Sequence, residues 1–389
     1  MSRYSGVSIV GVGETKYERT PSRPALGYLA DSINIALEDC GLGWKDIDGI
    51  ALNGVDPDNA VTVAEHFGLA PRWVYQGAGG NAFPIISILA AADAIKNGDA
   101  EVVVVAAAAA STPQKHREWV INFNKPMRDY VVSYGFGAEN GYFGLIERRH
   151  RHEYGTTREQ LGKLAVTQRG HAMLNPNALF DTELTLEAYL SARLIADPLR
   201  LFDCVMPCAG GDALVLVSTD HARSLGIPAV SIRGGGQHHN HSPQDIVALT
   251  YGWADFSDAM FEDAGIGRED IDLIQPYDDY PIMNLIQLED LGFCAKGEGG
   301  QFIERTSLTI NGELPLNTGG GQLSVGQAGA AGGLLGTVET VRQLLGRAGA
   351  RQVKNARIGL ANGFGMTAYG KGLSTSTIIL ENPLERSEK

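Results

Sequence analysis

The chain has 389 residues, of which 32 are Lys or Arg and 45 are Asp or Glu, so its formal net charge is −13 at pH 7. This acidic balance argues against a nucleic-acid-binding protein, because such a protein needs a basic surface to displace counterions from phosphates. The hydrophobic fraction of 44% is ample for a large core, and the length predicts two or three domains.

The first half of the chain alternates between strand and helix patterns. The expected elements are a strand at 7–12, a helix at 26–39, a strand at 47–52, a helix at 83–96, and strands at 101–109 and 213–218. The strand at 101–109 is apolar almost throughout, which predicts a sheet that is covered on both faces, as in layered α/β proteins.

Residues from about 112 to 205 interrupt this alternation. They are richer in Arg, His, Tyr and Asn, and they contain amphipathic stretches near 158–173 and 184–194. We interpret this region as a helical insertion that lies over the active face of the protein.

The second half returns to the alternating pattern. The expected elements are a strand at 229–234, a helix at 256–264, a strand at 271–276, a helix at 283–291, a helix that follows the glycine-rich run 317–333 and ends near 345, and strands at 356–361 and 374–380.

Two segments of the chain are nearly identical. Residues 38–50 and 262–274 share eight of thirteen residues at one fixed offset, without a gap. Each segment predicts a helix end, a glycine stop, a short turn and an apolar strand. We therefore predict two related halves, at about 1–222 and 223–389, with the active site where they meet.

Targeting and redox signals are few. The four cysteines do not predict a disulfide framework in a chain of this length, and the longest apolar run, 102–110, is too short to span a bilayer. The first residues contain no signal-peptide pattern. We expect a cytoplasmic protein that binds neither membrane nor nucleic acid.

Several motifs that suggest nucleotide, metal or serine chemistry are incomplete. The glycine clusters at 11–14 and 317–321 complete neither a dinucleotide fingerprint nor a P-loop, and Gly-x-Ser-x-Gly is absent. The histidines between His238 and His241 suggest a metal site, but adjacent histidines on a strand or turn point apart, and no carboxylate or cysteine lies at ligand spacing. Cys204 and Cys208 form a single pair, without the second pair of ligands that a zinc site needs. We therefore predict a polar loop at the histidines, and no metal centre.

Other residues resemble the thiolase superfamily. They are Gly77-Ala78-Gly79-Gly80-Asn81 before an apolar helix, and the run from Asn317 to Gln327. With the duplication and the order of elements, they are most similar to the sterol-carrier and lipid-transfer branch. The resemblance covers essentially the whole chain. It implies an α/β fold of two five-stranded βαβαβαββ halves in five αβαβα layers, with a helical loop-domain insertion that helps to bind coenzyme A.

The chain departs from the family at its catalytic positions. The position of the nucleophilic cysteine falls on Asn81, and that of the histidine in the Gly-His-Pro motif falls on Gln327. The late cysteine position falls on Ala361 or Asn362. Thiolysis needs a thiolate to accept the acyl group, and an asparagine side chain is neutral and non-nucleophilic. We therefore do not expect ordinary thiolase activity.

One motif keeps its chemistry. Tyr277 and Asp278 follow a strand where the family carries Asn-Glu or His-Asp, and Tyr277 and the segment 288–300 resemble the thiolase-like aldolases of steroid side-chain degradation. Such enzymes cleave a β-hydroxyacyl-CoA by a retro-aldol reaction, which needs a base for the β-hydroxyl proton and donors for the enolate oxygen. The resemblance implies Tyr277 with Asp278 as the base, and Asn81, Gln327 and loop amides as donors. Those aldolases carry a tyrosine at Gln327, and the alternative for Tyr277 is a strand cap with its hydroxyl on the surface.

The resemblance also implies where the substrate binds. The expected substrate-binding residues are Gly79, Gly80, Asn317, Gly319, Gly320, Gly321, Ser324, Gly363 and Phe364. The basic run from Arg148 to His152 would contact the phosphates of coenzyme A, or else form a solvated helix face or a subunit contact.

The expected function is therefore a carbon–carbon lyase acting on acyl-CoA, with coenzyme A as part of the substrate and no other cofactor. The alternatives are an acyl-CoA acyltransferase (a thiolase) and a non-catalytic scaffold or lipid carrier. The resemblance implies a homodimer and a small partner chain with zinc-ribbon and OB-fold parts. An open pocket ringed by Asn81, Tyr277 and Gln327 would favour the enzyme, and a filled pocket the scaffold.

Overall fold

The computed structural model describes residues 2–54, 59–77, 80–122, 125–136, 138–241, 245, 247–365, 367–368 and 371–382. The first half contains β1 (Val7–Glu14), α1 (Ala25–Cys40), β2 (Gly49–Asn53), α2 (Ala60–His66), β3 (Trp73–Gln76), α3 (Phe83–Asn97), β4 (Val102–Ala110), β7 (Ala209–Ser218) and α9 (Thr219–Leu225). Each element expected in this half is present, and α2, β3 and α9 are additions that the sequence analysis left unassigned.

The second half repeats the alternation, again with every expected element present. It contains β8 (Val230–His239), α10 (Trp253–Ala264), β9 (Leu273–Gln275), α11 (Pro281–Asp290), α12 (Gly299–Arg305), α13 (Gly321–Val325), α14 (Gly332–Leu344), β10 (Ile358–Phe364) and β13 (Ser374–Glu381). A small ribbon of β11 (Thr367–Ala368) and β12 (Lys371–Gly372) lies between the last two.

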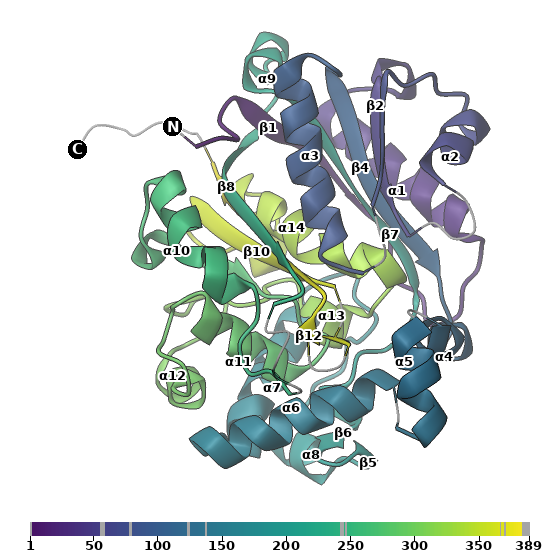
Figure 1. The fold of residues 1–389 in the computed structure, drawn as a ribbon. Coiled ribbons are helices and arrows are strands. Elements are labelled where there is room, and N and C mark those ends of the chain that lie inside the picture. The colour runs from purple at the N-terminus through teal and green to yellow at the C-terminus, as the bar shows by residue number, and fades with distance from the viewer. Residues whose placement is uncertain are drawn as a thin grey trace.

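The insertion between β4 and β7 is mostly helical, as expected. It contains α4 (Pro113–Asn122), α5 (Lys125–Tyr130), α6 (Ala138–Tyr154), α7 (Arg158–Ala172), α8 (Leu186–Ser191), β5 (Leu194–Ala196) and β6 (Leu199–Arg200). Figure 1 shows these helices below the sheet, in blue and teal. Among the described helices, none combines the length and the hydropathy that a membrane crossing requires.

One mixed sheet connects the two halves. Its strand order is β3-β2-β4-β7-β1-β8-β13-β10-β9. The halves meet where β1 pairs antiparallel with β8, over Ser8–Ser231 and Ile9–Val230.

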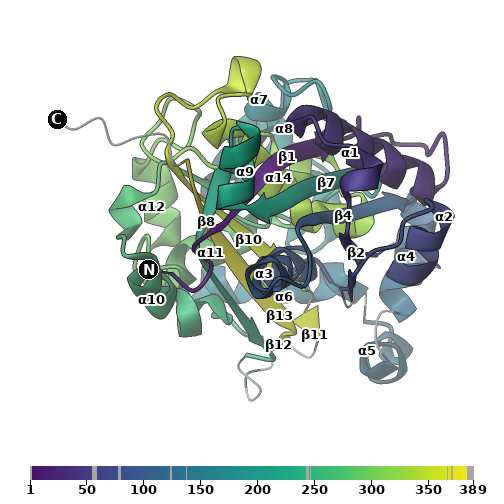
Figure 2. The same cartoon turned by 90° about the horizontal axis from the view of Figure 1, so that it is seen from above.

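The elements stack in five layers. A central apolar cluster joins α3 and α14 to the inner faces of both halves of the sheet, through residues such as Ile88, Leu216, Val338 and Ile378. A second cluster packs α1, α2 and α9 on the outer face of the first half. A third packs α10 and α11 on the outer face of the second half. Figure 2 shows α3 end-on between the two groups of strands.

The repeated segments have the same local structure. Helices α1 and α10 both end at a glycine in the left-handed conformation, Gly41 with φ 73° and Gly265 with φ 64°. Each is followed by a 3₁₀ turn, at Trp44–Asp46 and Arg268–Asp270. A left-handed residue carries little cost for glycine alone, which accounts for its presence at both helix ends.

The shared aspartates make the same bonds in both halves. The carboxylate of Asp46 accepts from the N–H of Gly43 at 2.8 Å, and that of Asp270 accepts from the N–H of Gly267 at 2.8 Å. Asp48 likewise accepts from the first N–H of β4 at 2.8 Å, and Asp272 from the first N–H of β10 at 2.9 Å. The identical residues are therefore those that hold the helix–turn–strand unit together, which supports the duplication. The division near residue 222 remains a proposal.

Among the described residues, the second half contributes four strands to the sheet, whereas the resemblance predicted five. At the expected place, Ile274 and Leu316 form an isolated parallel bridge. The N–H of Ile274 donates to the carbonyl of Pro315 at 2.9 Å, and the N–H of Asn317 donates to the carbonyl of Ile274 at 3.0 Å. Pro315 and Pro276 flank this bridge and have no N–H, so the ladder cannot extend on either side of it.

Candidate active site

The hydroxyl of Tyr277 is held by two side-chain amides. Asn81 Nδ2 donates to it at 2.6 Å, and Gln327 Nε2 donates to it at 3.2 Å. The three residues come from three places in the chain. Tyr277 follows β9, Asn81 precedes α3, and Gln327 lies in the loop after α13. The structure thus brings together three of the four residues that the sequence analysis proposed as catalytic.

The backbone of Tyr277 is fixed by one glutamine of α11. Gln287 Oε1 accepts from the N–H of Tyr277 at 2.9 Å, and its Nε2 donates to the carbonyl of the same residue at 2.7 Å. Gln287 Oε1 also accepts from Asn362 Nδ2 at 3.1 Å, and Asn362 Oδ1 accepts from the hydroxyl of Thr377 at 2.7 Å. A buried chain of polar contacts therefore runs from β13 through β10 and α11 to Tyr277, and fixes its backbone.

The two amide donors are also fixed at their backbones. Gly80, before Asn81, has a φ of 103°, and a Cβ there would lie 2.9 Å from Gly365 Cα. Only a glycine fits so close to the end of β10. The backbone of Gln327 pairs with the segment before β7. Its N–H donates to the carbonyl of Met206 at 2.9 Å, and its carbonyl accepts from the N–H of Cys208 at 3.0 Å.

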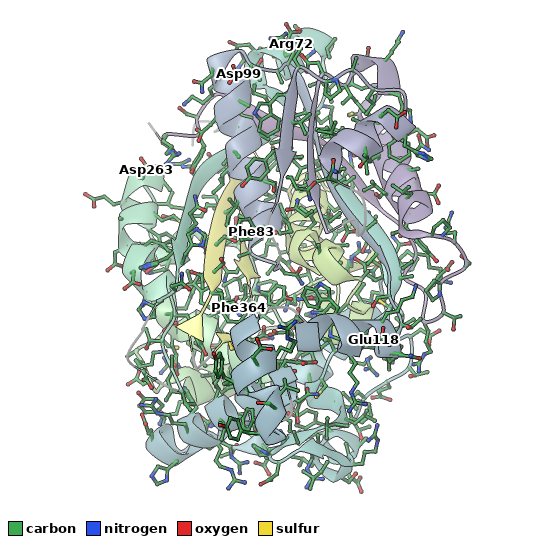
Figure 3. All side chains as sticks on the ribbon, turned by 45° about the vertical axis from the view of Figure 1, so that its right-hand side comes forward. Arg72, Phe83, Asp99, Glu118, Asp263 and Phe364 are labelled. Atoms are coloured by element: carbon green, nitrogen blue, oxygen red, sulfur yellow. The ribbon has the colours of Figure 1, made fainter. Side chains whose placement is uncertain are left out.

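Tyr277, Asn81 and Gln327 share the wall of an open cavity of about 560 Å³. This volume falls in the range of small-molecule sites. Much of the remaining wall is apolar and comes largely from the insertion: Pro113, Trp119, Val132, Phe136, Phe143, Ile195, Val205, Pro207 and Phe364. In Figure 3, Phe364 lies at the junction between the sheet and the insertion, below Phe83 at the start of α3. The pocket is open, as expected of an enzyme rather than a decayed scaffold.

Asp278 faces away from this cavity. Its carboxylate accepts from Gln168 Nε2 at 2.8 Å and from the N–H groups of Gln322 and Leu323 at 2.8 and 3.1 Å. Burial raises the pKa of Asp278 to about 7, against the opposing effect of these hydrogen bonds. The carboxylate therefore anchors α13 and α7, and has no contact with the larger cavity.

Asp279 lies on the cavity wall instead. Residues 277, 279 and 280 all line this cavity, whereas residue 278 does not. Asp279 is buried, and its Oδ1 has no hydrogen-bond partner within the described part of the chain. Burial, together with the negative charges of Asp278 and Glu139, raises the pKa of Asp279 well above the ordinary value.

The same cavity favours neutral forms of its other titratable groups. Burial raises the pKa of Tyr277, and Asp279 raises it further, whereas the hydrogen bonds from Asn81 and Gln327 act in the opposite direction. Burial also raises the pKa of Glu139 and lowers that of His116 to about 4. At neutral pH, Tyr277 is therefore a phenol and His116 a neutral imidazole. His116 Nε2 lies 3.8 Å from a carboxylate oxygen of Glu139.

The expected substrate-binding residues separate into three groups. Gly80 and Phe364 line the larger cavity, and Asn317, Gly319 and Gly321 line a space of only about 20 Å³ on the far side of Asp278. Gly320, Ser324 and Gly363 are packed into the protein, and Gly79 lies outside the described residues. A Cβ at Gly321 would lie 2.1 Å from Asp278 Oδ2, and one at Gly320 would lie 2.6 Å from Ala172 Cβ. The glycines of this run thus allow close packing and leave no room for a ligand.

The basic run on α6 is neutralised by carboxylates. Arg148 pairs with Asp197, and Arg149 pairs with both Glu153 and Asp245. Arg151 lies 3.7 Å from Glu147. These pairs favour the interpretation of the run as a solvated helix face over a phosphate site.

The sequence analysis missed His116, Glu139, Asp279 and Tyr280. The first two lie on the insertion, where no sequence motif marks them. Asp279 and Tyr280 belong to the same motif as Tyr277, but the motif alone does not show which of its side chains face the cavity. Tyr280 donates to Asn140 Oδ1 at 2.7 Å, and its ring stacks on Phe143 with a centroid separation of 4.1 Å.

One thiol, Cys204, lies on the cavity wall. Burial raises its pKa, and the charges of Asp203 and Glu139 raise it further, so the thiol stays protonated and weakly nucleophilic. Burial also raises the pKa of Cys40, Cys208 and Cys294. None of the four cysteines is therefore activated.

We expect no acyl-enzyme when the protein is incubated with acetyl-CoA or acetoacetyl-CoA. Intact-mass spectrometry is the measurement, with a Cys204→Ala variant as the control for adventitious labelling. A stable acyl adduct that the wild type forms and Cys204→Ala does not form would contradict the absence of covalent catalysis.

Comparisons with known proteins agree with this fold. The family model described as Thiolase C-terminal domain-like matches residues 234–382. A steroid side-chain-cleaving aldolase of Thermomonospora curvata is 32% identical over 352 residues, which cover 86% of this chain and 90% of the relative. A 17-hydroxy-3-oxo-4-pregnene-20-carboxyl-CoA lyase of Mycobacterium tuberculosis is 32% identical over 393 residues, which cover 96% of this chain and 98% of the relative.

A solved structure described as an Ltp2-ChsH2(DUF35) aldolase superposes with a TM-score of 0.84 at 30% identity, and the match covers 98% of both chains. The chain belongs to the thiolase superfamily, in the sterol-carrier branch that the sequence resembled.

Proposed function

We propose that this chain is a carbon–carbon lyase that cleaves a β-hydroxyacyl-CoA by a retro-aldol reaction in side-chain degradation. The observation that carries the proposal is the Tyr277 hydroxyl, held by Asn81 and Gln327 on the wall of an open cavity whose single thiol is not activated. The names of two relatives, an aldolase and a CoA lyase, support the same reaction class.

The reaction moves one proton off the substrate and one onto it. A base removes the β-hydroxyl proton, the C–O bond becomes a carbonyl, and the Cα–Cβ bond breaks with its electron pair. That pair is delocalised onto the thioester oxygen as an enolate, and Cα then takes a proton. The products are a ketone or aldehyde and a shorter acyl-CoA.

We assign Tyr277 the role of proton donor to the enolate, in place of the base that the sequence analysis proposed. Its raised pKa keeps the phenol protonated at neutral pH. Asn81 and Gln327 both donate to the phenolic oxygen, and Tyr277 lines the cavity, so we propose that its O–H donates to a substrate oxygen bound there. A neutral acid in an apolar site stabilises a developing oxyanion without the reorganisation that water requires. Asn81 and Gln327 are then positioning residues.

We assign the base to Asp279. Among the described residues its Oδ1 has no hydrogen-bond partner, and it lies on the same wall as Tyr277. Its raised pKa gives its ionised form a high affinity for a proton. The ionised form of Asp279 is therefore a stronger base than that of an ordinary surface aspartate. Asp278 supports this role at a distance, because its charge helps to raise the pKa of Asp279.

The cavity also supports the substrate class. Its apolar wall suits a bulky hydrophobic acyl group, and the exposed Arg117 on the same wall suits an anionic coenzyme A moiety. Coenzyme A enters as part of the substrate, and the reaction as written needs no further cofactor.

A substrate panel tests the function. We expect cleavage of β-hydroxyacyl-CoA thioesters with branched or cyclic apolar groups, without added coenzyme A. The acyltransferase alternative predicts the reverse, which is turnover of β-ketoacyl-CoA only when free coenzyme A is present. The scaffold alternative predicts tight binding of these thioesters with no product from either series.

We also propose a homodimer and a partner chain with zinc-ribbon and OB-fold parts. The comparison with the complex named Ltp2-ChsH2(DUF35) aldolase supports a partner chain. For the dimer, light scattering on the isolated chain should give about twice the chain mass of 41.5 kDa. A concentration-independent mass of 41.5 kDa would rule the dimer out.

A further inference from the structure

Two histidines and a carboxylate meet at the surface, where β8 ends beside α10. Asp255 Oδ2 lies 2.8 Å from His238 Nδ1, and it also forms a hydrogen bond with His241 Nδ1. One ligand atom from each of the three residues lies within 4.8 Å of the other two. No other such group of three was found among the described residues. None of the three residues lines the cavity at Tyr277.

The backbone explains why the two histidines converge. Residues three apart on a regular strand point to opposite faces. Asn240, between them, has a φ of 54°, and its N–H donates to the carbonyl of Leu373 at 3.1 Å. This left-handed residue ends the strand and turns His241 back toward His238.

The third residue comes from the neighbouring helix. Asp255 lies in the first turn of α10, which packs against β8 (Figure 1). Gly252 precedes this helix, and a Cβ there would lie 2.6 Å from His238 Cβ. The absence of a side chain at Gly252 thus allows the close approach that places Asp255 beside the histidines. The sequence analysis predicted no metal centre because it looked for a carboxylate near the histidines in sequence.

We propose that His238, His241 and Asp255 bind one divalent transition-metal ion of the zinc class. Two imidazoles and one carboxylate are ligands that such ions prefer, and three protein ligands leave one position for water. The side chains of His238 and Asp255 are 40% and 38% exposed, which leaves them room to adjust to metal–ligand bonds of about 2.0–2.2 Å. The ion would replace the protons that now connect the imidazoles to the carboxylate, and it would connect β8 to α10.

The described histidine and cysteine residues outside the cluster do not complete a different arrangement. His239 points away from this cluster, because its Nδ1 lies 2.8 Å from the Ser374 hydroxyl and its ring stacks near Phe83 with a centroid separation of 6.1 Å. The four cysteines of the chain are all outside the cluster.

The test is zinc binding by the full-length, tag-free protein after EDTA treatment and desalting. Isothermal titration with ZnCl₂ near pH 7.5 should show one saturable site per chain, and zinc should raise the melting temperature. His241→Ala and Asp255→Asn should each weaken the affinity by at least about 10–100-fold, since even residues that only support a metal ligand have effects of this size. His221→Ala, on α9, is the matched control and should bind zinc like the wild type.

Cobalt provides a second measurement that does not depend on stability. A Co²⁺ complex of the wild type should show visible d–d absorption without a thiolate charge-transfer band, and Asp255→Asn should lose that absorption. The absence of saturable binding, or equal affinity in the wild type and both ligand variants, would overturn the proposal. The cluster would then be a hydrogen-bonded ion pair only.

Discussion

Replacement of Tyr277 by phenylalanine is expected to lower kcat by about 10²–10⁴-fold, with a much smaller change in KM. The substitution removes the hydroxyl that Asn81 and Gln327 hold at 2.6 and 3.2 Å, and it leaves the ring in place. A group that acts mainly in the transition state affects kcat, whereas a group that only shapes the pocket affects KM. Steady-state kinetics on a cleavable β-hydroxyacyl-CoA is the measurement.

Two variants serve as controls for Tyr277→Phe. Tyr280→Phe removes a hydroxyl from the same cavity wall, where it donates to Asn140, and kcat should fall by less than about 10-fold. Asn81→Ala removes one hydrogen bond to Tyr277, which is worth about 0.5–1.5 kcal/mol, so kcat should fall by about 2–10-fold. Full kcat in Tyr277→Phe would show that Tyr277 only supports the structure.

Replacement of Asp279 by asparagine is expected to lower kcat by about 10²–10⁴-fold and to remove the main dependence of kcat on pH. The pKa of Asp279 is raised, so the ionised form that accepts a proton appears only as the pH rises through that value. The wild-type kcat should therefore increase as the pH rises through the pKa of Asp279, and a kcat–pH profile measures this increase. An Asp279→Asn variant with the wild-type profile would place the base elsewhere.

Asp278→Asn is the matched control for Asp279→Asn, because the two aspartates are adjacent and both buried. The asparagine would place a donor against the N–H groups of Gln322 and Leu323 and against Gln168, so we expect a loss of stability of about 1–3 kcal/mol. It also removes a charge that raises the pKa of Asp279, so the pH profile should move to lower pH. Thermal unfolding and the same kcat–pH profile distinguish the two aspartates.

The sequence was sufficient for the layers of the fold. Continuous apolar strands, helix-end glycines and the duplicated segments are local signals. Each of them predicts the strand, the helix end or the helix–turn–strand unit in which it lies. The fifth strand of the second half was not predictable in this way. Its loss depends on Pro315 and Pro276, whose missing N–H groups limit the pairing at Ile274 to one bridge.

The site could be predicted from the sequence only where a motif marks the residue. Tyr277, Asn81 and Gln327 were identified by position in motifs, and they meet in the structure. Asp278 was proposed because it follows Tyr277 where the family carries Asn-Glu or His-Asp, whereas Asp279 is the aspartate that lines the cavity. His116 and Glu139 depend on how the insertion folds over the sheet, and no spacing in the sequence encodes that contact.

The glycine-rich run is a different case. The resemblance implied that it contacts substrate, whereas Gly320 and Gly321 are close to Ala172 and Asp278. Glycine allows the backbone to approach either a ligand or another part of the protein, and the sequence does not distinguish the two. The cluster of His238, His241 and Asp255 was missed because its carboxylate comes from another element.

The most direct test of the account is the cleavage of a β-hydroxyacyl-CoA in D₂O without free coenzyme A, with the products analysed by mass spectrometry. A retro-aldol reaction predicts a shorter acyl-CoA that carries one deuterium at Cα, formed in equal amount with a ketone or aldehyde. A requirement for free coenzyme A, with turnover of β-ketoacyl-CoA instead, would contradict the proposed lyase and identify the chain as a thiolase.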